Sequence, residues 1–129
     1  MRARTRYSIH SPFLYSLYGD VLFASVARQV IPRCSGETRT HYRYRTMVYK
    51  FVDRFGMKSS AVYDGLTELA GEGAVTHAVV LCGPHRSAVA ERQWAYLCAD
   101  NRFNLAVDLF DVALVMRNDR VPRQQWVLR

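Results

Sequence analysis

The residues best placed for chemistry follow the most apolar run of the chain. Residues 75–82 are almost continuously apolar and rich in β-branched side chains, which predicts a strand buried on both faces, as in a parallel sheet. Cys82, His85 and Arg86 stand where this strand ends, the position at which α/β sheets present functional side chains. A Cys–His nucleophile pair also needs spatial contact and a third, orienting group, and neither is visible in the sequence. Because of its place at the end of this strand, His85 is the best-placed catalytic candidate.

Two aspartates and three other histidines are further candidates for acid–base chemistry. Asp108 and Asp111 flank an expected hairpin and are able to work as an acid–base pair, although the turn alone also explains Asp111. We expect His10 to cap or hydrogen-bond a loop and His41 to be exposed. We expect His77, inside the apolar run, to be a histidine with satisfied hydrogen bonds in the core.

The cysteines do not form a metal or disulfide pattern. Cys34, Cys82 and Cys98 are an odd number, are widely spaced and have no histidine at ligand spacing. They are predicted to be buried, reduced thiols, and no metal site is expected.

Basic side chains suggest a different kind of site. The net charge is +7; residues 1–58 hold 11 basic and 3 acidic side chains, and residues 59–129 hold 7 and 8. A basic first half indicates an anionic partner, although a general preference for arginine explains the same excess. The candidate anion- or nucleic-acid-binding residues are Arg39, Arg43, Arg45, Lys50 and Arg54, for which a solvated helix face is the alternative.

Two helices and a series of strands must position these groups. Ser11 and Pro12 begin a predicted helix over residues 11–28, and an apolar stripe predicts a second helix over residues 40–55 that Gly56 ends. A third helix is expected after Ser87. The shorter elements expected are strands at 61–63, 75–82, 103–109, 112–116 and 126–128, and a turn of helix at 66–70.

This order of elements predicts the fold class. Helices alternate with strands and an antiparallel C-terminal hairpin follows, so we expect an α/β fold with a mixed sheet. A single domain over residues 1–129 is expected, with a basic helical part at 1–58 and an α/β part at 59–129. No apolar run reaches the roughly 18 residues of a membrane span and no secretory signal is recognised, which predicts a cytoplasmic protein without a membrane partner.

Both ends of the chain carry motifs of one enzyme family. YSIHSPFLYSLYGDVL at 7–22, NLAVDLFDVALVMR at 104–117 and QQWVLR at 124–129 resemble the opening helix and closing hairpin of a bacterial class I S-adenosylmethionine-dependent methyltransferase-like family. RYRTMVYKFVDRF at 43–55 resembles the helix before its first strand, and SAVYDG at 60–65 resembles its entry into the sheet. Residues 78–110 resemble a late strand, a helix and the penultimate strand. The resemblance implies a Rossmann-like fold, with S-adenosylmethionine as the family's cofactor.

The family's cofactor site is much longer than the space available here. The resemblance places its glycine-rich loop at Asp64 and Gly65, which are the candidate cofactor-binding residues. Only 13 residues separate Gly65 from Val79, and because one βαβ crossover takes about a dozen or more, this space holds at most one crossover. The resemblance implies several strands and helices there, including the acidic residue that binds the ribose. We therefore expect a truncated, Rossmann-like methyltransferase fold that lacks most of the cofactor-binding half and has no cofactor, unless the S-adenosylmethionine site is retained.

Three functions are compatible with these features. The first is a methyltransferase-like protein that is not catalytic alone and acts in protein interaction, as a homo-oligomer or with a protein partner. The second is a small active S-adenosylmethionine-dependent methyltransferase whose site a partner chain completes. The third is a nucleic-acid- or anion-binding module that uses the basic helix at 40–55.

Overall fold

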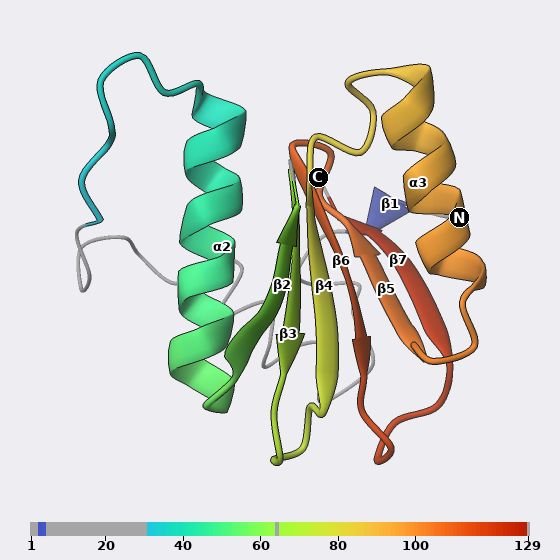
Figure 1. Cartoon of the computed structure of the whole chain (residues 1–129). Helices are drawn as coiled ribbons and strands as arrows, with labels where there is room; N and C mark the ends of the chain where they lie inside the picture. Colours follow the sequence, from blue (N-terminus) through green and yellow to red (C-terminus); the bar gives the residue numbers. More distant parts are fainter. Residues whose placement is uncertain (1–2, 5–30, 64, 129) are drawn as a thin grey trace.

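Two helices cover opposite faces of one mixed sheet (Figure 1). The computed structural model describes residues 3–4, 31–63 and 65–128. Within them the elements are β1 (Ala3–Arg4), α2 (Arg39–Phe55), β2 (Lys58–Tyr63), β3 (Leu66–Ala70), β4 (His77–Cys82), α3 (Ala88–Ala99), β5 (Leu105–Asp108), β6 (Val112–Arg117) and β7 (Gln124–Leu128). The helix expected over residues 11–28, with the HSPF motif and His10, lies outside the described residues.

The seven strands of the described residues lie in the order β1-β7-β5-β6-β4-β3-β2. β3 and β6 run opposite to the other five strands, because each is antiparallel to both of its neighbours, whereas β1, β7 and β5 are mutually parallel. The expected α/β class with a mixed sheet is confirmed. The carboxyl ends of β2, β4, β5 and β7 meet at the upper edge of the sheet in Figure 1, which we call the carboxyl edge.

The sheet corrects two predictions. Residues 66–70 form strand β3 and not a turn of helix, because they pair with β2 on one side and β4 on the other, which satisfies the backbone on both edges. β4 is buried at five of its six residues, as expected, but its neighbours β3 and β6 are both antiparallel. Its apolar run reflects helices on both faces and not the direction of the adjacent strands.

Successive residues of β4 alternate between two cores. Val80 packs on the α2 side with Phe51, which is fully buried. Val79 and Leu81 pack on the α3 side with Trp94. This period-2 alternation between two helix-covered faces explains why β4 lacks the polar positions of a strand that faces water.

The helix ends follow from local chemistry, and the predicted end of α2 at Gly56 and the predicted cap of α3 at Ser87 are confirmed. The Thr38 hydroxyl accepts a hydrogen bond from the His41 N–H at 3.1 Å and so caps the start of α2. Gly56 ends α2 with a left-handed φ of 62°. The Ser87 hydroxyl caps α3 by accepting a hydrogen bond from the Ala90 N–H at 3.1 Å.

The C-terminal strands agree with the expectation only in part. β5 and β6 form an antiparallel hairpin, with Asp108 opposite Ala113. β7 does not extend this hairpin beyond β6; it lies parallel to β5 on the other side. β4 and β5 are parallel to one another, separated by β6 and joined through α3.

Candidate functional site at the carboxyl edge

Three turns lie together at the carboxyl edge. Gly65 follows β2, Gly83 follows β4, and residues 109–111 connect β5 to β6. Backbone hydrogen bonds join these turns: the Cys82 N–H donates to the Gly65 carbonyl at 2.7 Å, and the Gly83 N–H donates to the Asp111 carbonyl at 2.8 Å. Side chains carried by these turns are therefore held in fixed relative positions.

His85 and Asp108 form the best-defined polar pair of this edge. The His85 Nε2 lies 2.6 Å from Asp108 Oδ2, and the Asp108 side chain is only 4 % exposed. The other carboxylate oxygen of Asp108 accepts a hydrogen bond from the Phe110 N–H at 2.8 Å. Both oxygens of this buried group therefore have donors, as a buried carboxylate requires.

Phe110 adds an aromatic surface to the pair. Its ring stacks on the His85 ring with a centroid separation of 5.5 Å and an interplanar angle of 24°. Phe110 is half-exposed and has a left-handed φ of 73°, which is unfavourable for a residue with a bulky side chain. The hydrogen bond from its N–H to Asp108 helps to hold this conformation.

The pair has the geometry of an oriented base. A carboxylate that accepts the Nε2–H fixes the imidazole tautomer and leaves Nδ1 as the proton acceptor. His85 thus has the orienting group that the sequence did not reveal, and the group is Asp108 and not Cys82, which packs in the core on the α2 side. Asp108 and Asp111 do not act as a pair with one another, since Asp108 binds His85 and Asp111 binds Arg43.

Arg86 occupies the space beside two glycines of the edge. Its aliphatic carbons lie against Gly83, where an added Cβ would be 3.1 Å from Arg86 Cδ. Its guanidinium lies against Gly65, where an added Cβ would be 2.9 Å from a guanidinium nitrogen. Gly65 and Gly83 both have a left-handed φ, of 73° and 56°. The chain's own arginine therefore covers the surface of Gly65 that a glycine normally leaves open for a ligand.

The candidate cofactor-binding pair is only partly described. Asp64 lies outside the described residues. Gly65 leads directly into β3, so an antiparallel strand follows this turn and not a helix. A helix N-terminus after a glycine-rich turn is the usual means by which such sheets bind a nucleotide-like cofactor.

Two of the five predicted anion-binding residues make intramolecular ion pairs. Arg43 Nη1 lies 2.6 Å from Asp111 Oδ2, which connects α2 to the carboxyl edge. Arg45 forms a two-pronged pair with Glu37, at 2.8 Å and 2.9 Å. Both arginines thus help to hold α2 in place, an alternative the sequence did not indicate because Glu37 and Asp111 lie in turns.

The remaining three predicted residues lie along α2. Burial, together with the nearby charge of Arg43, lowers the pKa of Lys50. The Arg54 guanidinium lies 5.4 Å from the centre of the Phe55 ring, and Arg39 is exposed in the first turn. A continuous stripe of five available cations is therefore not present.

Glu37 anchors the segment that precedes α2. Its carboxylate accepts hydrogen bonds from Arg45 and from the Cys34 N–H, and it lies 2.6 Å from His41 Nδ1. The hydrogen bond from Arg45, with smaller contributions from His41 and the Cys34 N–H, lowers the pKa of Glu37 to about 2. Folding therefore favours the ionised form of the Glu37 side chain over the protonated form.

The other histidines and the cysteines have mostly structural surroundings. His41 is exposed, as predicted, whereas His77 is the exposed first residue of β4 and not a core histidine. All three cysteines are free, as predicted, with Cys82 buried and Cys98 partly buried. Cys34 is exposed, which corrects the expectation of burial, because residues 31–37 form a surface turn before α2.

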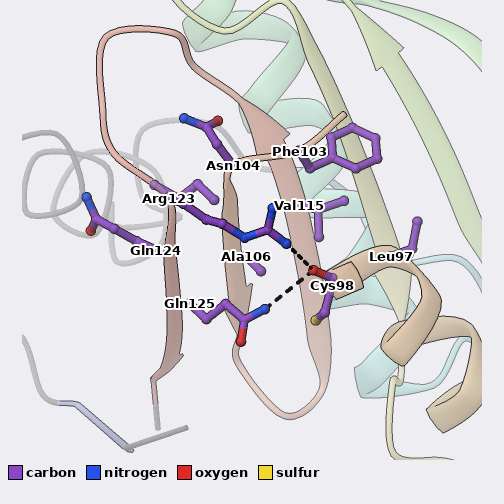
Figure 2. A pocket seen from close by; sticks show the side chains of 10 residues that line it. Leu97, Cys98, Phe103, Asn104, Ala106, Val115, Arg123, Gln124 and Gln125 are labelled. Carbon is purple, nitrogen blue, oxygen red and sulfur yellow. Dashed lines mark hydrogen bonds between the residues drawn. The ribbon is translucent and has the colours of Figure 1, made fainter. Parts of the chain in front are cut away.

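A shallow hollow lies on the α3 side, away from the carboxyl edge (Figure 2). It is open to solvent and has no enclosed volume for a ligand, whereas small ligand sites enclose roughly 300 Å³. Arg123 and Gln125 donate hydrogen bonds across it to the Cys98 carbonyl, at 3.1 Å and 3.4 Å, and so satisfy the C-terminal end of α3. Burial and the charge of Asp108 raise the pKa of the Cys98 thiol to about 11, although Arg123 opposes this shift. The hollow is therefore a helix-capping contact.

Searches for other features and for relatives gave negative results. In the described ranges 3–4, 31–63 and 65–128, no helix has the length and apolar character needed to cross a membrane. The same ranges contain no cluster of three metal-ligating side chains. Comparison with protein-family models, with curated proteins and with solved structures gave no match.

Proposed function

We propose that this chain is a methyltransferase-like α/β domain that does not bind S-adenosylmethionine by itself and acts through protein interaction. The motif resemblance at 7–22 and 104–129 supports the relationship to the methyltransferase-like family. The exposed apolar side chains of the sheet edge and of α3 support an interaction role; they include Val62, Tyr63, Val89 and Tyr96.

One observation carries the proposal. The guanidinium of Arg86 lies against Gly65, the residue at which the family's cofactor loop begins. The next residues form β3, so the segment that follows the glycine adds an antiparallel strand to the sheet. A nucleotide-like ligand at Gly65 would have to displace the arginine and would meet no helix N-terminus there.

Isothermal titration with S-adenosylmethionine tests the proposal, with wild type and Arg86→Ala measured side by side. We expect no heat of binding in either protein. Binding by wild type at micromolar concentration and equal stoichiometry would refute the proposal. Binding by Arg86→Ala alone would leave the proposal standing for the native chain and would identify the arginine as the group that blocks the site.

A second candidate function is favoured by the His85–Asp108 pair. If a partner chain supplies the cofactor-binding half, His85 has the geometry to take a proton from the atom that accepts the methyl group, with Asp108 holding the imidazole. This proposal predicts methyl transfer in cell extract that is lost in His85→Ala and retained in His77→Ala, a matched change of an exposed histidine. Equal activity of the two variants would exclude it.

A further inference from the structure

Strand β2 is the outermost strand on its side of the sheet formed by the described residues. Among the described strands it pairs only with β3, and it is the last strand in the order (Figure 1). Val62 and Tyr63 are 67 % and 63 % exposed although they point to opposite faces of the sheet. Outward-facing N–H and C=O groups on such an edge are a template for another strand.

The strand lacks most of the features by which natural edge strands prevent pairing. It contains no proline, and Lys58 at its first position is its single charged residue. It has one irregularity between Ser59 and Ala61, but the Ser60 hydroxyl there turns inward and donates to the Glu68 carbonyl of β3 at 3.3 Å. Residues 61–63 therefore form a regular, uncharged stretch on the outer side.

We propose that β2 pairs antiparallel with β2 of a second copy of this chain, so that the two sheets become continuous. The charge distribution favours this partner and this direction. Antiparallel pairing brings Lys58 of each copy toward the end of the other strand that carries Tyr63, where an ammonium and an aromatic ring attract one another. Parallel pairing would instead place two Lys58 ammonium groups side by side.

The exposed face of α3 is the main competing surface. Val89 and Tyr96 are seven positions apart in the sequence and lie on one face of the helix. Their side chains are 65 % and 79 % exposed. Arg92, which lies between them on the same face, keeps this patch charged and solvated. It also offers no unpaired backbone groups, because α3 satisfies its own. The edge of β2 is therefore the better surface for self-association.

The dimer is expected to be modest in affinity. Each strand has six residues and an irregularity between Ser59 and Ala61, so the paired length is at most about 20 Å and buries less than the roughly 1,600 Å² of a standard interface. The inference rests on the proposed interaction role, to which it adds the surface and the partner.

Light scattering coupled to size exclusion, over a series of concentrations, tests the inference on the full chain. We expect the mass to rise from 14.9 kDa toward twice that value. Val62→Lys should raise the dimer Kd by about tenfold or more, because it places an ammonium group in the new ladder. Tyr96→Lys, a matched change on α3, should leave the Kd unchanged.

Tyr63→Lys provides a second edge variant, and circular dichroism confirms that each protein is folded. A wild-type chain that is monomeric at all concentrations overturns the inference, as does a dimer that both edge variants retain or that Tyr96→Lys abolishes. The result is separate from that of the cofactor titration: a dimer that binds S-adenosylmethionine refutes the proposed function alone, and a monomer that does not bind it refutes the β2 pairing alone.

Discussion

His85 in the loop after β4 is hydrogen-bonded at 2.6 Å to Asp108 at the end of β5, although strand β6 lies between these two strands. The bond therefore passes over the beginning of β6. It joins the loop that follows β4 to the last residue of β5, the two strands that α3 connects. Because the Asp108 side chain is almost completely buried, its carboxylate depends on this donor and on the Phe110 N–H. The same pair that has the geometry of a base also holds the carboxyl edge together.

Removing either partner should destabilise the fold. We expect His85→Ala and Asp108→Ala each to lower the free energy of unfolding by about 1–3 kcal/mol, since the first leaves Oδ2 of the buried Asp108 carboxylate without a donor and the second leaves His85 and the Phe110 N–H without an acceptor. The double variant should lose less than the sum, with a coupling of at least about 0.5 kcal/mol, because the two residues interact directly. Urea unfolding of the four proteins measures this coupling.

The control for this cycle is an exposed pair. Asp100 and Arg102 lie 2.8 Å apart, with the arginine side chain 70 % exposed. Asp100→Ala is expected to change the free energy of unfolding by less than about 1 kcal/mol, as surface pairs usually do. If the His85 and Asp108 effects are additive, or no larger than the Asp100 effect, the buried pair does not connect β4 to β5 as described.

The contact between Gly65 and Arg86 gives a second double-variant test. Gly65→Ala is expected to cost about 1–2 kcal/mol from the left-handed backbone, and more because the new methyl group displaces the Arg86 guanidinium. In an Arg86→Ala background the steric part should disappear and the backbone part should remain. Gly36→Ala supplies the backbone part alone, since Gly36 has a φ of 75° and nothing within 4 Å of an added Cβ. An equal effect of Gly65→Ala in both backgrounds would contradict the observed packing.

The pH dependence of stability should report on Glu37. Its pKa is about 2 in the folded chain and ordinarily 4.5, so folding favours the ionised form. The resulting contribution is complete above pH 4.5 and is lost as the pH falls toward 2. Chemical unfolding at a series of pH values in this window should give a steeper loss of stability in wild type than in Glu37→Gln.

Two arginine variants identify the cause of this dependence. Arg45→Ala should also flatten the profile, because the hydrogen bond from Arg45 makes the largest contribution to the lowered pKa of Glu37. Arg39→Ala removes an exposed arginine of the same helix and should keep the wild-type profile. An unchanged slope in both Glu37→Gln and Arg45→Ala would show that other carboxylates dominate acid unfolding.

The local elements were largely predictable because their determinants are local. Thr38 and Gly56 cap α2 with side-chain and backbone chemistry that is readable in the sequence, and Ser87 does the same for α3. The apolar run that ends at Cys82 is buried on both faces, as expected, although its neighbouring strands are antiparallel and not parallel. These signals require no knowledge of which segments meet in space.

One error concerns a local signal and the others concern partners that are distant in the sequence. Leu66–Ala70 is a strand because β2 and β4 both pair with it, and the Asp-Gly pair at 64–65 directly before it is a hairpin signal that the family resemblance assigned to a cofactor loop instead. By contrast, the contacts of Arg43 with Asp111 and of His85 with Asp108 join residues that only the folded sheet brings together. The sequence named both aspartates as candidates, but not the arginine and the histidine that they bind. These contacts depend on how the strands pair and have no local signal in the sequence.

Thiol chemistry should distinguish Cys34 from Cys98. Thiolate is the reactive form, and a pKa of about 11 leaves very little Cys98 thiolate at neutral pH. Cys82 is buried in the core, whereas Cys34 is exposed. We therefore expect one rapidly reacting thiol in the native chain with a disulfide reagent, and three after denaturation. Mass spectrometry should locate the first label on Cys34, and Cys34→Ser should abolish the fast phase.

Arg123, whose guanidinium binds the Cys98 carbonyl, refines the prediction for the Cys98 thiol. Arg123 partly opposes the rise in the Cys98 pKa, while its guanidinium donates to the Cys98 carbonyl. Arg123→Ala therefore raises the pKa further but also removes a cap of α3, which exposes the end of the helix. If the electrostatic effect dominates, the slow reaction of Cys98 becomes slower at fixed pH. If loss of the cap dominates, Cys98 reacts faster and hydrogen exchange in the last turn of α3 rises with it. A fast native label on Cys98 in the wild-type chain would contradict the burial and the raised pKa together.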